Sequence, residues 1–325
     1  MASATQEEQL TKYLSDAHSI EKQALPQMRL APRLADDPEI AGMFREHELE
    51  TEEHERLVGE RLAAHGESPS RIKDAVMAAG GPGFALFARL QPDTAGKLVS
   101  HAYSYEHLEL ASYELLERVA ERLGDPETAE TARRIKEQER LMGERLAGAF
   151  DRAADISLGE VGREDLDEQL AKYLADAHAI ENQALELLDK GPKLAGDPEL
   201  ERLYAEHHEE TREHQRLIGE RLEAHGESPS KLKDAAMRLG GLNWGGFFAA
   251  HPDTPGKLAA FAYAFEHLEI AGYEQLRRVA ERAGDAETVA VVERILAEER
   301  AAAEKIAGAW DRAAEASLRE QGRAA

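Results

Sequence analysis

The 325-residue sequence contains no cysteine. Disulfide bonds and thiolate metal ligands are therefore excluded, and the composition fits a reducing compartment. Apolar runs are short as well, and none approaches the roughly 18 residues that a membrane-spanning helix needs. The first residues, MASATQEEQL, lack the apolar core of a signal peptide. We therefore expect a cytoplasmic protein with no segment in a membrane.

Basic and aromatic residues are scarce too. There are 40 Lys and Arg against 64 Asp and Glu, which gives a formal net charge of −24, and aromatic residues make up 6%. No stretch is basic enough to bind a phosphate backbone, so we expect no nucleic-acid partner. The negative field either attracts cations such as Fe²⁺ or Mn²⁺ or only keeps the protein in solution. Alanine, glutamate, leucine and arginine dominate instead, which favours helices.

The sequence repeats itself at an offset of 160 residues without a gap. The run GESPS at 66–70 recurs at 226–230, and Asp151-Arg152 recurs as Asp311-Arg312. This period is far too long for a solenoid. We therefore predict a duplicated domain, with repeat one at 1–154, a linker at 155–166 and repeat two at 167–325.

Each repeat has four long helical patterns. In the first they cover about 7–34, 37–65, 94–123 and 126–154, with a short helix expected at 69–79. The first and second patterns, and the third and fourth, are joined tightly, whereas roughly 28 residues separate the second from the third. The sequence therefore predicts an all-α protein of two tandem ferritin-like four-helix bundles, each with a long crossover between helices two and three.

The apolar stripe of each helix is interrupted by acids and histidines near its middle. In helix two the stripe reads Ile40, Met43, His47, Glu50, His54, Leu57, and it recurs 160 residues later with His207, Glu210 and His214. The other helices contribute Glu21, Glu106, Glu109 and Glu139, and in the second repeat Glu181, Glu266, Glu269 and Glu299. Mid-helix residues of a bundle share one level, so these side chains should form one layer. A rival stripe in helix two, Glu46, Glu50, Glu53, Leu57, is the pattern of a solvated face.

Burial of such a layer requires compensation. An unpaired buried ion costs several kcal/mol, so five of them would exceed the whole stability of a domain, about 5–15 kcal/mol. The acids must reach water, hold protons or bind cations. We predict two divalent metal ions per repeat, and oxygen and imidazole ligands without sulfur favour iron, with manganese or zinc as alternatives.

Further polar residues flank the predicted layer. They could be ligands or could hydrogen-bond to ligands, and the two arginines could pair with an outer carboxylate or be solvated: His18, His47, Tyr113, Arg140, His178, His207, Tyr273 and Arg300. His107 and His267 fall about 100° off the acid-bearing face of helix three, so we expect a structural role for them.

Five segments of the first repeat resemble the YciE/YciF-type ferritin-like proteins of bacteria. They are SIEKQAL (19–25), HELETEEHERL (47–57), GESPSRIKDAVMAAGG (66–81), YEHLELASYELL (105–116) and EQERLMGERL (137–146), and the second repeat has matching segments. The resemblance implies stress-associated dimetal bundles. It places ligands at Glu21, Glu50, Glu106, Glu109 and Glu139, and at Glu181, Glu210, Glu266, Glu269 and Glu299.

The sequence departs from the common ferritin-like pattern of Glu-x-x-His on two helices. Glu50 is followed by His54 at the fourth position, and Glu139 is followed by Met142 at the third, where the second repeat has Ala302. Helix three could supply the missing ligand.

Two functions remain open at this point. The protein could be a redox-active dimetal protein that acts as a ferroxidase or reduces O₂ or peroxide. Alternatively, it could be a non-catalytic metal-binding protein in which the ions stabilise the bundles. In either case we expect the two tethered repeats to form a pseudo-dimer within the chain, with Phe44 and Tyr204 available either for that contact or for the bundle cores.

Overall fold

The computed structural model describes residues 6–67, 94–159, 165–228 and 255–323. Within these residues every element of regular structure is a helix, which confirms the predicted fold class. The helices of the first repeat are α1 Gln6–Leu34, α2 Pro38–Ala64, α5 Thr94–Leu123, α6 Pro126–Gly148 and α7 Phe150–Leu158. Those of the second repeat are α8 Leu166–Leu188, α9 Gly191–Leu194, α10 Pro198–Ala224, α13 Pro255–Ala283, α14 Ala286–Ala307 and α15 Trp310–Arg323.

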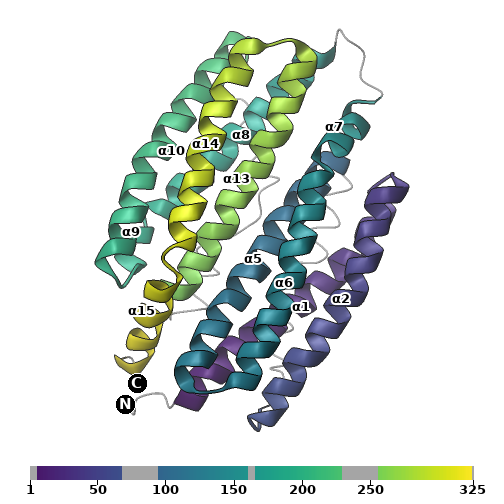
Figure 1. Ribbon diagram of the computed structural model, residues 1–325. Coiled ribbons are helices and arrows are strands. Elements are labelled where there is room, and N and C mark those ends of the chain that lie inside the picture. The colour runs from purple at the N-terminus through teal and green to yellow at the C-terminus, as the bar shows by residue number, and fades with distance from the viewer. Residues whose placement is uncertain (1–5, 68–93, 160–164, 229–254, 324–325) are drawn as a thin grey trace.

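The long helices form two bundles that lie side by side (Figure 1). Helices α1, α2, α5 and α6 make the first bundle, and α8, α10, α13 and α14 make the second. The expected short helix at 69–79 lies outside the described residues. No described helix is long and apolar enough to cross a bilayer.

The connections between α1 and α2 and between α5 and α6 are short and polar, which makes each pair of helices antiparallel. Asp37 caps α2, where its carboxylate accepts hydrogen bonds from the backbone N–H groups of Glu39 and Ile40, each at 3.0 Å. Gly124 adopts a φ of 78° between α5 and α6, a conformation in which a side chain would be strained. Asp125 then caps α6 through the N–H of Thr128 at 3.0 Å. The local sequence thus ends one helix and starts the next within a few residues.

The fourth predicted helix is divided. Helix α6 ends at Gly148, and α7 begins at Phe150 and continues to Leu158. The expected linker at 155–166 is therefore shorter in the structure, because its first four residues belong to α7 and α8 begins at Leu166. Helix one is also treated differently in the two repeats: α1 continues through Pro26 and Pro32, whereas its counterpart is broken into α8 and α9.

The two bundles meet along α5 and α13. The hydroxyl of Ser104 donates a hydrogen bond to the carbonyl of Ala264 at 2.8 Å. The rings of His107 and His267 stack with centroids 3.6 Å apart and an angle of 16° between their planes. Further rings extend this stack on both sides into one continuous aromatic column, in the order Phe150, Tyr103, His107, His267, Tyr263, Trp310.

The terminal helix of each repeat packs on the other repeat. Asp151 of α7 lies 2.6 Å from Arg278 of α13, and Asp311 of α15 lies 2.6 Å from Arg122 of α5. Tyr13 donates a hydrogen bond to Ser317 of α15 at 2.7 Å. Each bundle is therefore completed by a segment of its neighbour.

Phe44 and Tyr204, which the sequence offers either for the contact between repeats or for the bundle cores, are both buried within their own repeats. Phe44 is buried in a core cluster with Met28, Leu98 and Leu146 of its own bundle. The ring of Tyr204 is covered by Gly191, where an added Cβ would lie 3.2 Å from it.

We expect each repeat to self-associate when it is expressed alone. Without its partner, the face of α5 or α13 and the exchanged terminal helix would expose apolar surface. In the full chain the tether provides an effective concentration of about millimolar, so the chain should stay small and form no cage. Light scattering on residues 1–159, on residues 165–325 and on the full chain measures this. A stable monomeric repeat, or a large hollow assembly of the full chain, contradicts the expectation.

Candidate metal centre

Six side chains from four helices converge in the middle of the first bundle. Each is at most 1% exposed: Glu21 from α1, His47 and His54 from α2, Glu106 and Glu109 from α5, and Glu139 from α6. They are the mid-helix residues that the stripe pattern places at one level. Four carboxylates and two imidazoles therefore share one buried layer.

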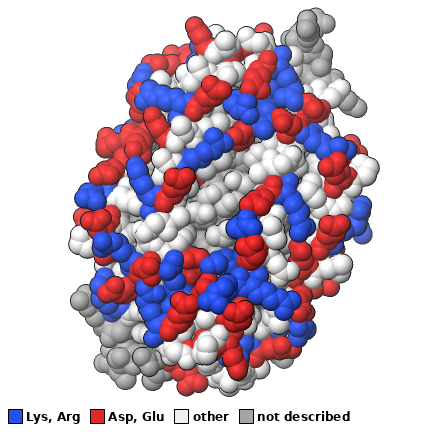
Figure 2. Space-filling model, in the orientation of Figure 1, with Lys and Arg blue, Asp and Glu red and all other residues white. Residues whose placement is uncertain are grey.

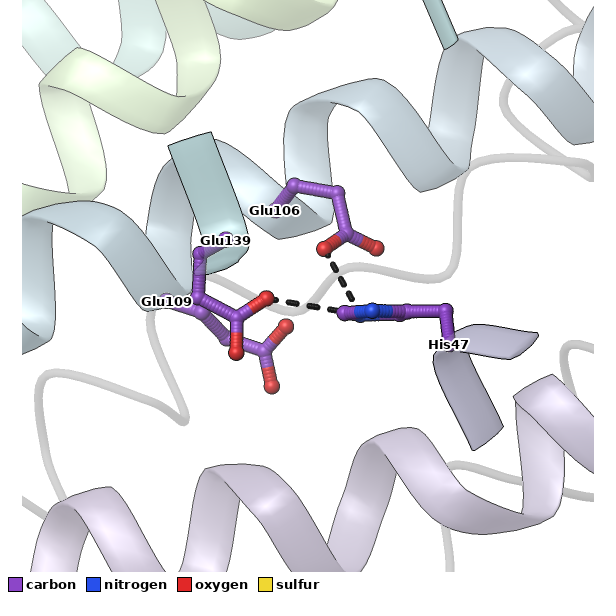
Figure 3. A group of neighbouring side chains, drawn as sticks. All are labelled: His47, Glu106, Glu109 and Glu139. Carbon is purple, nitrogen blue, oxygen red and sulfur yellow. Dashed lines mark ion pairs between the residues drawn. The ribbon is translucent and has the colours of Figure 1, made fainter. Parts of the chain in front are cut away.

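Four of these residues form one group. Donor atoms of His47, Glu106, Glu109 and Glu139 all lie within 4.8 Å of one another, and their side chains point toward a common centre (Figure 3). Nε2 of His47 lies 2.9 Å from Oε2 of Glu106 and 3.3 Å from Oε2 of Glu139. These four donor groups are close enough to one another to coordinate a single cation.

A second group shares one member with the first. It consists of Glu21, His54 and Glu139. Nδ1 of His54 lies 2.8 Å from Oε1 of Glu139 and 3.7 Å from Oε1 of Glu21. The two oxygens of Glu139 thus face different histidines, which is how a carboxylate that bridges two cations is placed.

The second repeat has the same layer. Its groups are His207, Glu266, Glu269 and Glu299, and Glu181, His214 and Glu299. Oε2 of Glu299 lies 3.5 Å from His207, and Oε1 lies 2.7 Å from His214. Glu299 therefore occupies the same position as Glu139, between the two histidines.

Helix α2 presents a different face from the one expected. Glu50 lies outside both groups: its side chain is 26% exposed, and its Oε2 lies 2.9 Å from Nδ1 of His47. Glu210 has the same relation to His207, at 3.0 Å. The buried stripe runs through Phe44, Thr51 and Val58 rather than through Met43, Glu50 and Leu57. His47 and His54 belong to both stripes. The histidines are therefore buried as predicted, whereas Glu50 lies at the edge of the layer, partly exposed to solvent.

The flanking residues are placed as follows. His18 is buried beside Glu55, with 3.0 Å between Nε2 and Oε1, and the side-chain amide of Asn182 lies 3.2 Å from Nδ1 of His178. Arg140 pairs with Glu137 on the surface at 2.7 Å, and Arg300 pairs with Glu274. None of these four predicted residues belongs to the groups.

The two tyrosines contact the layer directly. The hydroxyl of Tyr113 donates to Oε1 of Glu21 at 2.5 Å, and that of Tyr273 donates to Glu181. Both rings are at most 2% exposed. A tyrosine in this position holds the carboxylate of the second group in one orientation.

The layer is poorly satisfied by the protein alone. Among the described residues, neither carboxylate oxygen of Glu106, Glu109 or Glu139 has a hydrogen-bond partner. Burial, together with the charge of Glu139, raises the pKa of Glu21 to about 8, and burial raises the pKa of Glu106 to about 7. Although burial opposes the charge of His54, Glu139 raises the pKa of that imidazole to about 9. When ionised, these acids carry more negative charge than the two imidazoles can balance, so protons or cations must compensate the rest.

The donor set fits two divalent ions. Four carboxylates carry four negative charges when ionised, and two divalent cations neutralise them. Oxygen and imidazole donors without sulfur suit iron or manganese, and zinc is compatible. Glu139 would bridge the two ions, with His47, Glu106 and Glu109 on one side and Glu21 and His54 on the other.

A family model described as "Domain of unknown function (DUF892)" matches the chain twice, over residues 5–158 and 165–319. These matches cover both bundles, including α7 and most of α15. No solved structure matches the chain.

We expect the metal-free protein to lose stability as the pH rises from 5 to 9. Glu21 and Glu181 have pKa values near 8 in the folded protein against 4.5 unfolded, and His54 and His214 have values near 9 against 6.5. In both cases the folded state holds protons that the unfolded state releases, so the stability is complete at low pH and is lost as the pH rises through the folded values. Melting of chelator-treated protein should fall by at least about 5 °C over this range.

Added metal should reverse this trend, because metal binding displaces those protons and becomes tighter as the pH rises. The double variant Glu21→Gln, Glu181→Gln should flatten the profile of the metal-free protein. A melting temperature that is constant or rises between pH 5 and 9 in the metal-free wild type contradicts the proposed protonation of the layer.

Proposed function

The chain belongs to the DUF892 family over both of its halves, and we propose on that premise that each half is a ferritin-like dimetal-carboxylate domain. In this proposal the ions are iron by preference, and the protein handles metal or reduces O₂ or peroxide as part of stress protection in the cytoplasm. One observation supports the proposal: in each repeat six buried acids and histidines from four helices face one another, and most of the acid oxygens accept no hydrogen bond among the described residues.

When bound, a pair of iron ions would supply electrons to O₂ or peroxide. The residues of the chain would hold and orient the pair. Tyr113 fixes Glu21 through its hydroxyl, and Glu50 contacts Nδ1 of His47, which leaves Nε2 directed at the layer. The tautomer of His47 would thereby be set from the rim.

Glu50 also connects the layer to solvent. Its carboxylate is partly exposed and touches a fully buried imidazole, with Arg145 3.6 Å away on the outer side. In the second repeat Lys305 occupies a similar place, 3.5 Å from Glu210. This contact gives the proton on Nδ1 of His47 an acceptor that reaches solvent, while Nε2 would be left for the cation.

A second function is favoured by the burial of the layer. All six ligand candidates are at most 1% exposed in the first repeat and at most 3% in the second, which resembles a closed structural site more than an open catalytic one. In this alternative the ions only neutralise the acids and stabilise the bundles, and no substrate is turned over.

We expect about four metal ions per chain, two in each repeat. Glu139→Gln should reduce the content to about two, because the bridging residue serves both ions of its own repeat only. Glu137→Gln, two residues away and exposed, is the matched control and should retain all four. Glu50→Gln should retain the number of ions but weaken their binding roughly tenfold, since it only orients His47.

Elemental analysis of protein purified without chelators measures these contents. The dimetal proposal fails if the wild type contains no transition metal and takes none up. The assignment of one centre to each bundle fails if Glu139→Gln empties both repeats.

Aerobic addition of Fe²⁺ separates the two functions. A redox protein should oxidise added Fe²⁺ faster than buffer does, with saturation at about four ions per chain, and Glu139→Gln should halve the saturating amount. Optical absorbance of Fe³⁺ follows the reaction, and metal content is measured in parallel. Binding of four ions without accelerated oxidation would support the structural alternative.

A further inference from the structure

A pocket of about 340 Å³ opens between the two repeats, and none of the ligand candidates of the metal layers lines it. Its walls come from α5, α6 and α7 of the first repeat and from α13 and α14 of the second. On the face of the molecule shown in Figure 2, uncharged side chains form a hollow between rims of mixed charge. Pockets of this size between domains are the usual place for small organic ligands.

Aromatic rings line much of the pocket. Tyr103, Phe150, Tyr263 and His267 all border it, and they belong to the aromatic column between the repeats. The centroids of Tyr103 and Phe150 are 5.3 Å apart, and those of Tyr103 and His267 are 5.7 Å apart. These separations are typical of edge and offset contacts, so a further ring could join the group in the same geometry.

The charges at the pocket are balanced. Arg278 pairs with Asp151 at 2.6 Å and also with Glu274, and Arg300 pairs with Glu274 too. With Glu304, the lining contains two arginines and two glutamates. A charged ligand would therefore gain little net attraction, whereas the carboxylates can accept a hydrogen bond from a hydroxyl group and the guanidinium groups can donate one.

We propose that this pocket binds a small, uncharged, planar aromatic alcohol, of the phenol or quinol class. The ring packs among the tyrosines and Phe150, and the hydroxyl group meets the paired charges at the edge. None of the ligand candidates of the metal layer lines this pocket.

The duplication supplies a natural test. The position equivalent to Phe150 in the second repeat is Trp310, which lies edge-on to Tyr263 with centroids 5.3 Å apart and is 4% exposed. Phe150 stands in the same relation to Tyr103. Phe150→Trp therefore places in the pocket a larger ring that the fold already accommodates at the twin position, and Trp310→Phe is its matched control.

The experiment is calorimetric titration of the full chain with 2-naphthol. Cyclohexanol, which has a hydroxyl group but no aromatic ring, serves as the control ligand. The wild type should bind one 2-naphthol per chain, Trp310→Phe should retain that binding at the Phe150 pocket, and cyclohexanol should bind at least about tenfold more weakly. Phe150→Trp should weaken the binding of 2-naphthol about tenfold or more, because the added ring atoms occupy its place. Near-ultraviolet circular dichroism and melting of the three proteins verify that the fold is retained.

The proposal is overturned if the wild type does not bind 2-naphthol, or if Phe150→Trp binds it as well as the wild type does. Equal weakening by Phe150→Trp and Trp310→Phe assigns the binding to the interface in general and also overturns the site. Equal binding of cyclohexanol and 2-naphthol overturns the aromatic class. Because the metal content is measured on the same samples, a failure here is distinguishable from a failure of the dimetal proposal.

Discussion

The packing of four acids at the centre of each bundle is the constraint on which the rest of this structure depends. Each acid on its own would cost several kcal/mol to bury in ionised form. The layer therefore cannot be assembled by apolar packing, and it needs either protons or cations at the moment when the four helices close. Buried apolar residues flank the layer, with Leu14 and Ile135 in the cluster on one side and Met28 and Met142 in the cluster on the other, and they confine the acids to one level.

Helix α5 and its counterpart α13 serve two faces at once. Glu106 and Glu109 face the layer, while His107, between them in the sequence, faces the other repeat. An angular step of about 100° per residue makes this division unavoidable on a helix. The turn that presents two ligands is consequently the turn that stacks on the neighbouring bundle, so the site and the interface cannot be varied independently. Helices α7 and α15 add to this dependence, since each packs on both interface helices, α5 and α13.

The sequence predicts most of this arrangement where one stripe per helix is clearly apolar. Glu21, Glu106, Glu109 and Glu139 all lie on stripes whose other members are buried in the structure. Helix α2 is different, because Met43 and Leu57 compete with Phe44 and Val58 for the core. Both stripes have the same period and share His47 and His54, so periodicity alone cannot choose between Glu50 and Thr51. One feature of the sequence does distinguish the two stripes. The stripe that is buried continues beyond Val58 with a further apolar residue, Leu62.

The contact between repeats could not be read from helical periodicity. A stripe analysis indicates which side of a helix is apolar, but α5 and α13 are apolar on more than one side, and the choice of partner depends on three-dimensional fit. His107 and His267 were correctly separated from the acid-bearing face, yet nothing in the pattern indicates that they meet each other. The same limit applies to α7, whose nine residues follow α6 after a break at Ala149 that no proline marks.

The two layers are built alike, but their surroundings differ in charge. Nε2 of His54 lies 3.2 Å from the side-chain oxygen of Gln138, which is neutral, whereas Nε2 of His214 lies 2.7 Å from the carboxylate of Glu298. A carboxylate at that distance favours the positively charged or metal-bound form of an imidazole more than an amide does. The duplicated chain thus repeats its ligands while changing the group behind one of them. Because ligand basicity affects how strongly a site holds a cation, the dimetal proposal implies that the two halves would hold their ions with unequal strength, even though the six candidate positions coincide residue for residue.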